Sequence, residues 1–146
     1  MAAGGAVAAG WRSSHHPAHT GLSRPSCGSA LTHFLTSDTQ LLHADPGALG
    51  CFVRAVRDCK HASLGVTAMG VDTGTDYVFT VQPGSASCRV IEQRQAYSAN
   101  FGGSKGALVA VPCRRIAVTR AGVTLSCRGQ RVLIPATVSG TAPHPA

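Results

Sequence analysis

The sequence predicts an α+β fold, in which one main N-terminal helix packs on one face of an antiparallel meandering sheet and disulfides join the two. Three observations predict it: a capped amphipathic stretch after residue 45, an alternating apolar pattern from residue 64 onward, and an even set of six cysteines. A chain of 146 residues has the size of one domain and needs no partner to form a core. We expect about five to seven short strands in the sheet.

The main helix is expected to begin at Asp45 and to run to Cys59. Asp45 is a suitable N-cap, and Pro46 suits the first turn because the amide hydrogen that it lacks would have no partner there. The apolar residues that follow recur at helical spacing and form one stripe, which should face the sheet. They are Leu49, Phe52, Val53 and Val56.

Two further patterns flank this helix. Before it, Leu31, Phe34 and Leu35 have the i, i+3, i+4 spacing of a short helix. After it, apolar residues alternate with polar or small ones, and short turns separate the runs, so neighbouring strands should pair antiparallel. The expected strands are 64–68, 77–81, 88–97, 108–111, 116–119, 123–127 and 132–134.

The ends of the chain lack these patterns. Residues 1–27 are rich in small and polar residues, and we expect a disordered leader or the remnant of a signal peptide or membrane anchor there. Residues 28–138 should form the single domain. Residues 139–146 are expected to be a disordered tail.

The six cysteines show no C-x-x-C spacing of the kind that zinc and redox sites use, so three disulfides in an oxidising compartment are expected. The protein should accordingly lie outside the cytoplasm, secreted or anchored at the cell envelope. Cys51 and Cys59 are about 12 Å apart on the expected helix. Because a disulfide needs Cα atoms within about 7 Å, each must bond a cysteine on another element. We predict the pairs Cys27–Cys51, Cys59–Cys88 and Cys113–Cys127.

Positive charge comes from eleven Arg and two Lys against six acidic residues, giving a net charge of +7. This excess favours an anionic polymer or a membrane surface as partner, and no pattern for specific nucleic-acid recognition is present. The candidate anion-binding residues are Arg114, Arg115 and Lys105, the last in a glycine-rich loop. Since adjacent residues of a strand point to opposite faces, Arg114 and Arg115 are not expected to form one continuous patch.

Asp72, Thr73 and Gly74 form an Asp-Thr-Gly motif that is open to two interpretations. In a turn, Asp accepts a local backbone hydrogen bond and Gly supplies positive φ. The motif also resembles the active-site triplet of retroviral-type aspartic proteases, which carry a flap where this chain has the glycine-rich stretch Phe101–Gly106. That resemblance implies a dimer, because catalysis needs two carboxylates that share a proton. The turn is our primary interpretation, and a dimeric protease using Asp72 is the alternative.

One more motif concerns metals. His15, His16 and His19 could together bind a metal ion weakly, although a solvated leader is the default interpretation. No cofactor is implied by any motif. The sequence therefore predicts a small secreted or cell-envelope domain, stabilised by disulfides, that acts by binding rather than by catalysis and contacts an anionic component of the envelope. The abundance of Arg, Ala and Gly is typical of a bacterium with GC-rich DNA.

Overall fold

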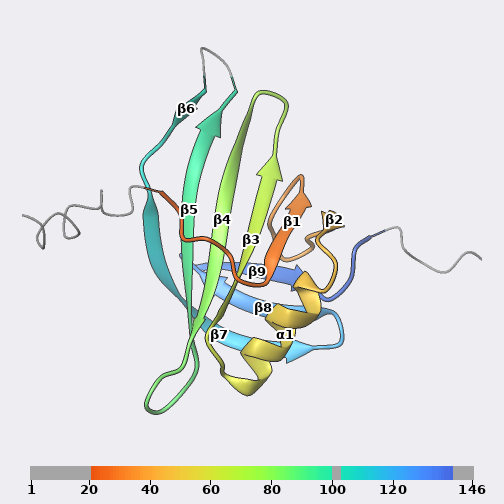
Figure 1. Cartoon of the computed structure of the whole chain (residues 1–146), viewed down its shortest axis with the longest axis vertical. Helices are drawn as coiled ribbons and strands as arrows, with labels where there is room; N and C mark the ends of the chain where they lie inside the picture. Colours follow the sequence, from red (N-terminus) through yellow and green to blue (C-terminus); the bar gives the residue numbers. More distant parts are fainter. Residues whose placement is uncertain (1–20, 100–102, 140–146) are drawn as a thin grey trace, which may run out of the picture.

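The computed structural model describes residues 21–99 and 103–139, which form a strongly curled β-sheet around one short helix (Figure 1). The elements in chain order are β1 (Gly28–Thr32), β2 (Leu41–Ala44), α1 (Ala48–Asp58), β3 (Ala62–Met69), β4 (Thr73–Gln82), β5 (Arg89–Ser98), β6 (Ser104–Lys105), β7 (Val109–Thr119), β8 (Gly122–Cys127) and β9 (Gln130–Pro135). The sheet order is β2-β1-β3-β4-β5-β7-β8-β9, and β6 pairs with β5. The predicted α+β class was wrong, because the described residues are mostly β and their sheet is mixed.

The N-terminal part of the sheet differs most from the prediction. Leu31 lies in β1, and Phe34, whose side chain is 75% exposed, lies in the following loop, so no helix forms here. A run of so few apolar residues fits a strand as well as a helix. β1 lies between β2 and β3, antiparallel to the former and parallel to the latter. A parallel pair needs a long crossover, which β2 and α1 together supply.

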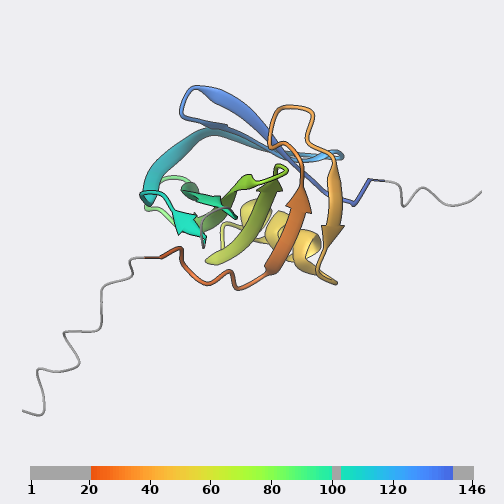
Figure 2. The same cartoon turned by 90° about the horizontal axis from the view of Figure 1, so that it is seen from above.

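Helix α1 lies within the curl of the sheet (Figure 2). It begins later than predicted, with Gly47 at the N-cap in the left-handed region (φ 77°). The carboxylate of Asp45 instead accepts a hydrogen bond of 2.8 Å from the backbone amide of Ser29, which ties the start of the helix to β1. The helix contacts β1 and β3 on one side and β7 and β8 on the other.

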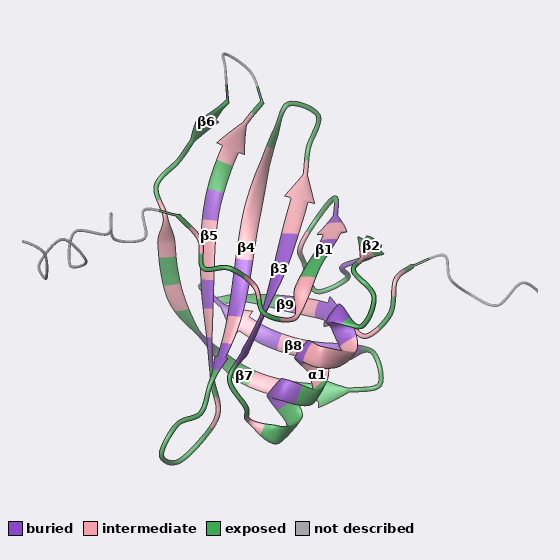
Figure 3. Ribbon diagram, in the orientation of Figure 1, coloured by how far each residue is buried: buried purple, intermediate pink, exposed green. Residues whose placement is uncertain are grey.

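The core fills the space between α1 and the concave face of the sheet (Figure 3). Phe52 of the helix packs against Phe79 of β4, with ring centroids 6.5 Å apart. Along β4 and β5, the inward residues Phe79, Val81 and Val90 are completely buried. Glu92 lies on the same inward face of β5 and is also completely buried.

Two backbone hydrogen bonds connect the two edges of the curled sheet. The amide of Leu133 donates to the carbonyl of Thr36 at 2.8 Å, and the amide of Ser139 donates to the carbonyl of Leu41 at 3.0 Å. These bonds hold the β9 end of the sheet close to the β2 end. They also occupy backbone groups that would otherwise be free at the edges.

Residues 21–27 run across the outer face of β3, β4 and β5 (Figure 1). Ser26 and Ser63 exchange two hydrogen bonds of 2.9 Å between backbone amide and side-chain hydroxyl. The amide of Ser23 donates to the side chain of Gln93 at 3.1 Å. This part of the segment assigned to a leader is therefore packed against the sheet.

Three disulfides fasten these elements, and the predicted pairing is confirmed. α1 is continuous, and its cysteine and the one at its C-cap each bond to another element, as the helix geometry requires. The pair at β7 and β8 joins two neighbouring strands. The disulfides, with their Cα separations, are Cys27–Cys51 (5.6 Å), Cys59–Cys88 (5.4 Å) and Cys113–Cys127 (4.3 Å). Within the described part of the chain, no helix has the length and apolar character to cross a membrane.

Candidate anion-binding site

Arg114 and Arg115 lie in the middle of β7 at a β-bulge. Arg114 pairs with Ser126 of β8, and the register then shifts before Ala117. The extra residue allows Arg115 to take a φ of 50°, which non-glycine residues seldom adopt. The bulge interrupts the strand alternation, and both arginines are exposed and line the same two hollows. The expectation that they face opposite sides does not hold, because it assumed a regular strand.

The first hollow lies between the C-terminal end of α1, the start of β5 and the middle of β7. Its volume is about 640 Å³, and its lining includes Arg57, Arg89, Arg114 and Arg115. Arg57 forms an exposed ion pair with its neighbour Asp58 at 3.4 Å. Among the described residues, no acidic side chain pairs with the other three arginines. Their charges are therefore available to a ligand.

The second hollow adjoins the first along β7. Its volume is about 510 Å³, and its lining includes Arg114, Arg115 and Arg128 together with Ser126. Because both hollows share Arg114 and Arg115, these two side chains stand between them. We call the five arginines of the two hollows the arginine site: Arg57, Arg89, Arg114, Arg115 and Arg128.

Every residue of the arginine site lies within two positions of a disulfide-bonded cysteine. In a strand, a cysteine that points into the core is followed by a residue that points outward. The disulfide therefore holds the backbone from which the arginine projects, and less backbone freedom is lost when a ligand binds. This alternation applies to Cys113–Arg114 in β7, while Arg89 directly follows Cys88 at the start of β5 and Arg128 directly follows Cys127 in the β8–β9 turn.

Arg128 is anchored by a buried carboxylate. Its Nε donates a hydrogen bond of 2.9 Å to Oε1 of Glu92, whose side chain is completely buried, while the Arg128 side chain is 25% exposed. Arg128 and Gly129 form the two-residue turn between β8 and β9, and both have positive φ, as a type I′ turn requires. The turn thus directs Arg128 toward Glu92.

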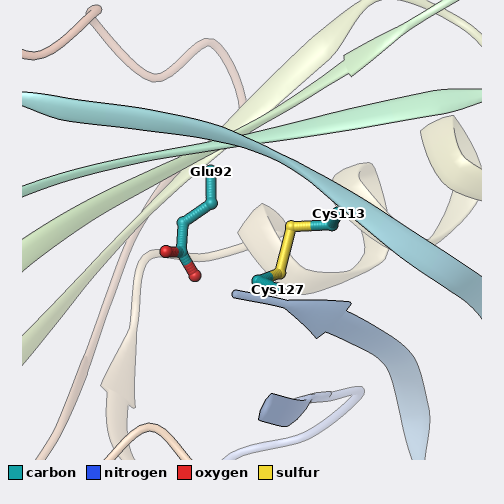
Figure 4. A group of neighbouring side chains, drawn as sticks. All are labelled: Glu92, Cys113 and Cys127. Carbon is teal, nitrogen blue, oxygen red and sulfur yellow. A yellow bond between two sulfur atoms is a disulfide. The ribbon is translucent and has the colours of Figure 1, made fainter. Parts of the chain in front are cut away.

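The carboxylate of Glu92 also lies next to the Cys113–Cys127 disulfide (Figure 4). The donor atoms of these three residues are within 4.8 Å of one another. The two sulfurs are bonded to each other, so neither is the thiolate that a metal ion would need. Oε2 of Glu92 is buried without a hydrogen-bond partner in the described structure. In the oxidised protein this group is a structural ion pair beneath the arginine site.

Lys105, the third predicted anion-binding residue, lies apart from the two arginines. It is exposed in β6, where it pairs with Tyr97 near the C-terminal end of β5. Cys113, next to Arg114, pairs with Val90 at the opposite end of the same strand. At about 3.3 Å per residue, the two positions are about 23 Å apart along the sheet. The structure brings together Arg114 and Arg115 and leaves Lys105 separate from them.

Asp72 lies exposed in the turn between β3 and β4, next to Val71, which is 98% exposed. Its carbonyl accepts a hydrogen bond of 2.8 Å from the amide of Ala99. Gly74 is the second residue of β4 and is paired with Tyr97, whose ring covers it so closely that an added Cβ would collide with the phenol. Gly74 is not among the glycines with positive φ, so the turn role predicted for it was wrong, and cross-strand packing explains this glycine instead. His15, His16 and His19 lie outside the described residues.

A further hollow of about 640 Å³ lies at the end of the curled sheet opposite the arginine site. Tyr77, Tyr97 and Phe34 belong to its lining. Its described lining residues include no Arg, Lys, Asp or Glu, and His33 is the sole imidazole. This hollow therefore lacks the charge that distinguishes the arginine site.

Arg57, Arg89 and Arg128 were not predicted from the sequence as binding residues. The repeated Cys-Arg pattern is the signal that could have found the last two, whereas Arg57 depends on how α1 docks. Guanidinium groups present forked donors that match carboxylate, sulfate and phosphate oxygens, so the chemistry available to the site is anion binding. No protein-family model, curated protein or solved structure matches the chain.

Proposed function

We propose that the protein is a binding domain, secreted or held at a bacterial cell envelope, that contacts an anionic component of its surroundings through the arginine site. The extracellular location in this assignment rests on the three disulfides, which fit an extracellular domain. The bacterial envelope is inferred from composition alone. One observation carries the binding role: five arginines from α1, β5, β7 and the β8–β9 turn line two adjoining hollows.

The charge balance around the site supports the same role. Among the six acidic residues, only Asp58 and Glu92 pair with arginines of the site. Arg89, Arg114 and Arg115 keep unneutralised charge around concave surfaces, where electric fields are focused and anions are attracted. An anion that bridges these groups would relieve their mutual repulsion.

The test is retention of the purified protein on a sulfated matrix and on an uncharged matrix of the same polymer. The double variant R114Q/R115Q should elute from the sulfated matrix at distinctly lower salt than the wild type. The matched control is R54Q/R120Q, which removes the same charge from exposed arginines outside both hollows. Equal elution of the two double variants would overturn the proposal, because net charge alone would then explain retention.

A Lys105→Gln variant tests whether Lys105 contributes to anion binding together with Arg114 and Arg115. Because Lys105 lies about 23 Å from the arginines along the sheet, its loss should change elution less than the loss of Arg114 and Arg115. An effect of Lys105→Gln as large as that of R114Q/R115Q would place the anion contact elsewhere on the surface.

A further inference from the structure

On three of the four neighbouring strands β5, β7, β8 and β9, an arginine lies at the same cross-strand register position. Arg114 of β7 pairs with Ser126 of β8, and Ser126 pairs with Arg131 of β9. On the other side, Val90 of β5 pairs with Cys113, so continuing that register by one residue places Arg89 opposite Arg114. We call Arg89, Arg114 and Arg131 the arginine row. It runs across the strands rather than along them.

The members of the arginine row share the outer face of the sheet. Val90, Cys113 and Val132, each adjacent in sequence to one of them, point inward and are buried. The three arginines are exposed, and Ser126 between two of them is half-buried. With strands about 4.8 Å apart, the three steps from β5 to β9 cover about 14 Å.

This arrangement is unfavourable without a ligand. Like charges directly opposite each other on neighbouring strands repel, as Arg89 and Arg114 do. In the described part of the chain, none of the three arginines of the row forms an ion pair with an acidic side chain. The neighbouring positions in the row are Ser126 and, on β4, Gln82, which is paired with Arg89. Neither is charged, so only a bound anion would neutralise the row.

We propose that the ligand of this surface is a linear polyanion, a flexible polymer with an anionic group on each repeat, which crosses β5, β7, β8 and β9 along the arginine row. This inference rests on the proposed function and names its ligand class. Successive anionic groups contact Arg89, Arg114 and Arg131, and the Ser126 hydroxyl donates to the chain between them. The hollows on either side of Arg114 and Arg115 accept groups that project from the polymer.

A membrane surface fits these features less well. A flat bilayer would leave the two hollows unfilled. Surface binding is also strengthened by apolar side chains that enter the bilayer, and Val118, 38% exposed, is the sole large hydrophobic residue of the hollows with such exposure. Three hydrophobic side chains are more exposed, but all lie away from the row. Phe34 is in the loop before β2, Leu42 is in β2, and Val71 is in the turn after β3.

The experiment is a length series measured by calorimetry on the folded, oxidised protein. The probes are inorganic sulfate and phosphate, sulfated oligosaccharides and polyphosphates of increasing length, and vesicles of anionic phospholipid. The two polymer series share the proposed chemistry. Affinity should rise with length in both and level off once the chain spans the row, and each polymer should bind more weakly as salt increases.

The variants are R89Q/R114Q/R131Q and, as a control of equal net charge, R24Q/R54Q/R120Q. The row variant should lose about tenfold or more in polymer affinity and show a shallower dependence on salt. The control should stay within about threefold of the wild type. Circular dichroism and urea unfolding verify that both variants are folded.

Three outcomes would overturn the inference, and they differ in what they say about the proposed function. Equal affinity for inorganic sulfate and for long polymers would show that the site binds single anions and not a polymer, and the proposed function would stand. Binding of vesicles but of neither polymer would assign the surface to membranes. Absence of binding to every anion would remove the proposed function as well.

Discussion

Arg128 and Glu92 form an ion pair of 2.9 Å that joins the β8–β9 turn to the interior of the curled sheet. The carboxylate is completely buried, and among the described residues the Arg128 guanidinium is its sole hydrogen-bond partner. Removing one partner of such a pair leaves a charge in the core, which is more damaging than removing both.

Arg128→Asn should therefore destabilise the protein by about 3 kcal/mol, although Asn tolerates the left-handed backbone of this turn. Replacing Glu92 by Leu in the same chain should recover most of the loss, since no unpaired carboxylate then remains. Urea unfolding measures both effects. A loss below about 1 kcal/mol in the single variant would contradict the account of this pair.

Arg115→Asn makes the same substitution at the β7 bulge, but here we expect no loss of stability. Arg115 also has positive φ, but among the described residues it has no acidic partner. Relief of backbone strain should leave stability unchanged or raise it by up to about 1 kcal/mol. Retention on a sulfated matrix should nevertheless weaken. If Arg115→Asn unfolds the protein as readily as Arg128→Asn does, Arg115 has a structural role that the bulge geometry does not explain.

Gly74→Ala should destabilise the protein by about 3 kcal/mol. The added Cβ would collide with the phenol of Tyr97 and would lie 2.7 Å from the carbonyl oxygen of Ala68, which belongs to the backbone and cannot swing away. Adding Tyr97→Ala should restore only part of the loss. Gly21→Ala is the matched control, because nothing lies within 4 Å of its added methyl group. Equal unfolding midpoints for the two glycine variants would refute this packing.

The Cys59–Cys88 disulfide should affect ligand binding as well as stability. It holds the end of α1 near Arg57 and the start of β5 at Arg89, while Cys27–Cys51 lies elsewhere. The two disulfides span 29 and 24 residues, so removing either by paired Ser substitutions should lower stability by a similar amount, about 3 kcal/mol.

Of the two double variants, C59S/C88S should also weaken retention on the sulfated matrix, whereas C27S/C51S should not. Retention is measured at a temperature at which both variants are folded. Identical retention of the two variants would show that this disulfide does not position the arginines.

Asp72→Asn tests the protease alternative. Asp72 lies exposed in a turn, and Gly74, two residues later, is explained by its packing against Tyr97. We expect neither the wild type nor the variant to cleave a peptide library at acid pH. Cleavage by the wild type that disappears in Asp72→Asn would establish the alternative and set aside the turn interpretation.

Local patterns in the sequence predicted the parts of the fold that depend on local physics. Alternation located β3, β4, β5, β8 and β9, and helix rise showed that Cys51 and Cys59 could not bond to each other. β1 was missed because its pairing with β3 is parallel and long-range, which no local period reveals. The bulge was missed because Arg115, rather than the glycine usual at positive φ, occupies it.

The candidate site was predicted only in part, because it also depends on long-range strand pairing. Arg114 and Arg115 were identified from charge, but Arg89 joins them only through the register between β5 and β7, which are separated in sequence by β6. Lys105 was grouped with them by charge and by its loop, but the pairing of β6 with β5 places it at the far end of β5.

Mapping the disulfides of the native protein tests the central claim most directly, because they fix the strands from which the arginines project. Digestion without reductant, by trypsin and by a protease that cuts at aspartate, separates every cysteine pair for mass spectrometry. The account predicts linked peptides for Cys27–Cys51, Cys59–Cys88 and Cys113–Cys127, with no cysteine alkylated beforehand. Alkylation of all six cysteines in undenatured protein, or a different set of linked peptides, would contradict it.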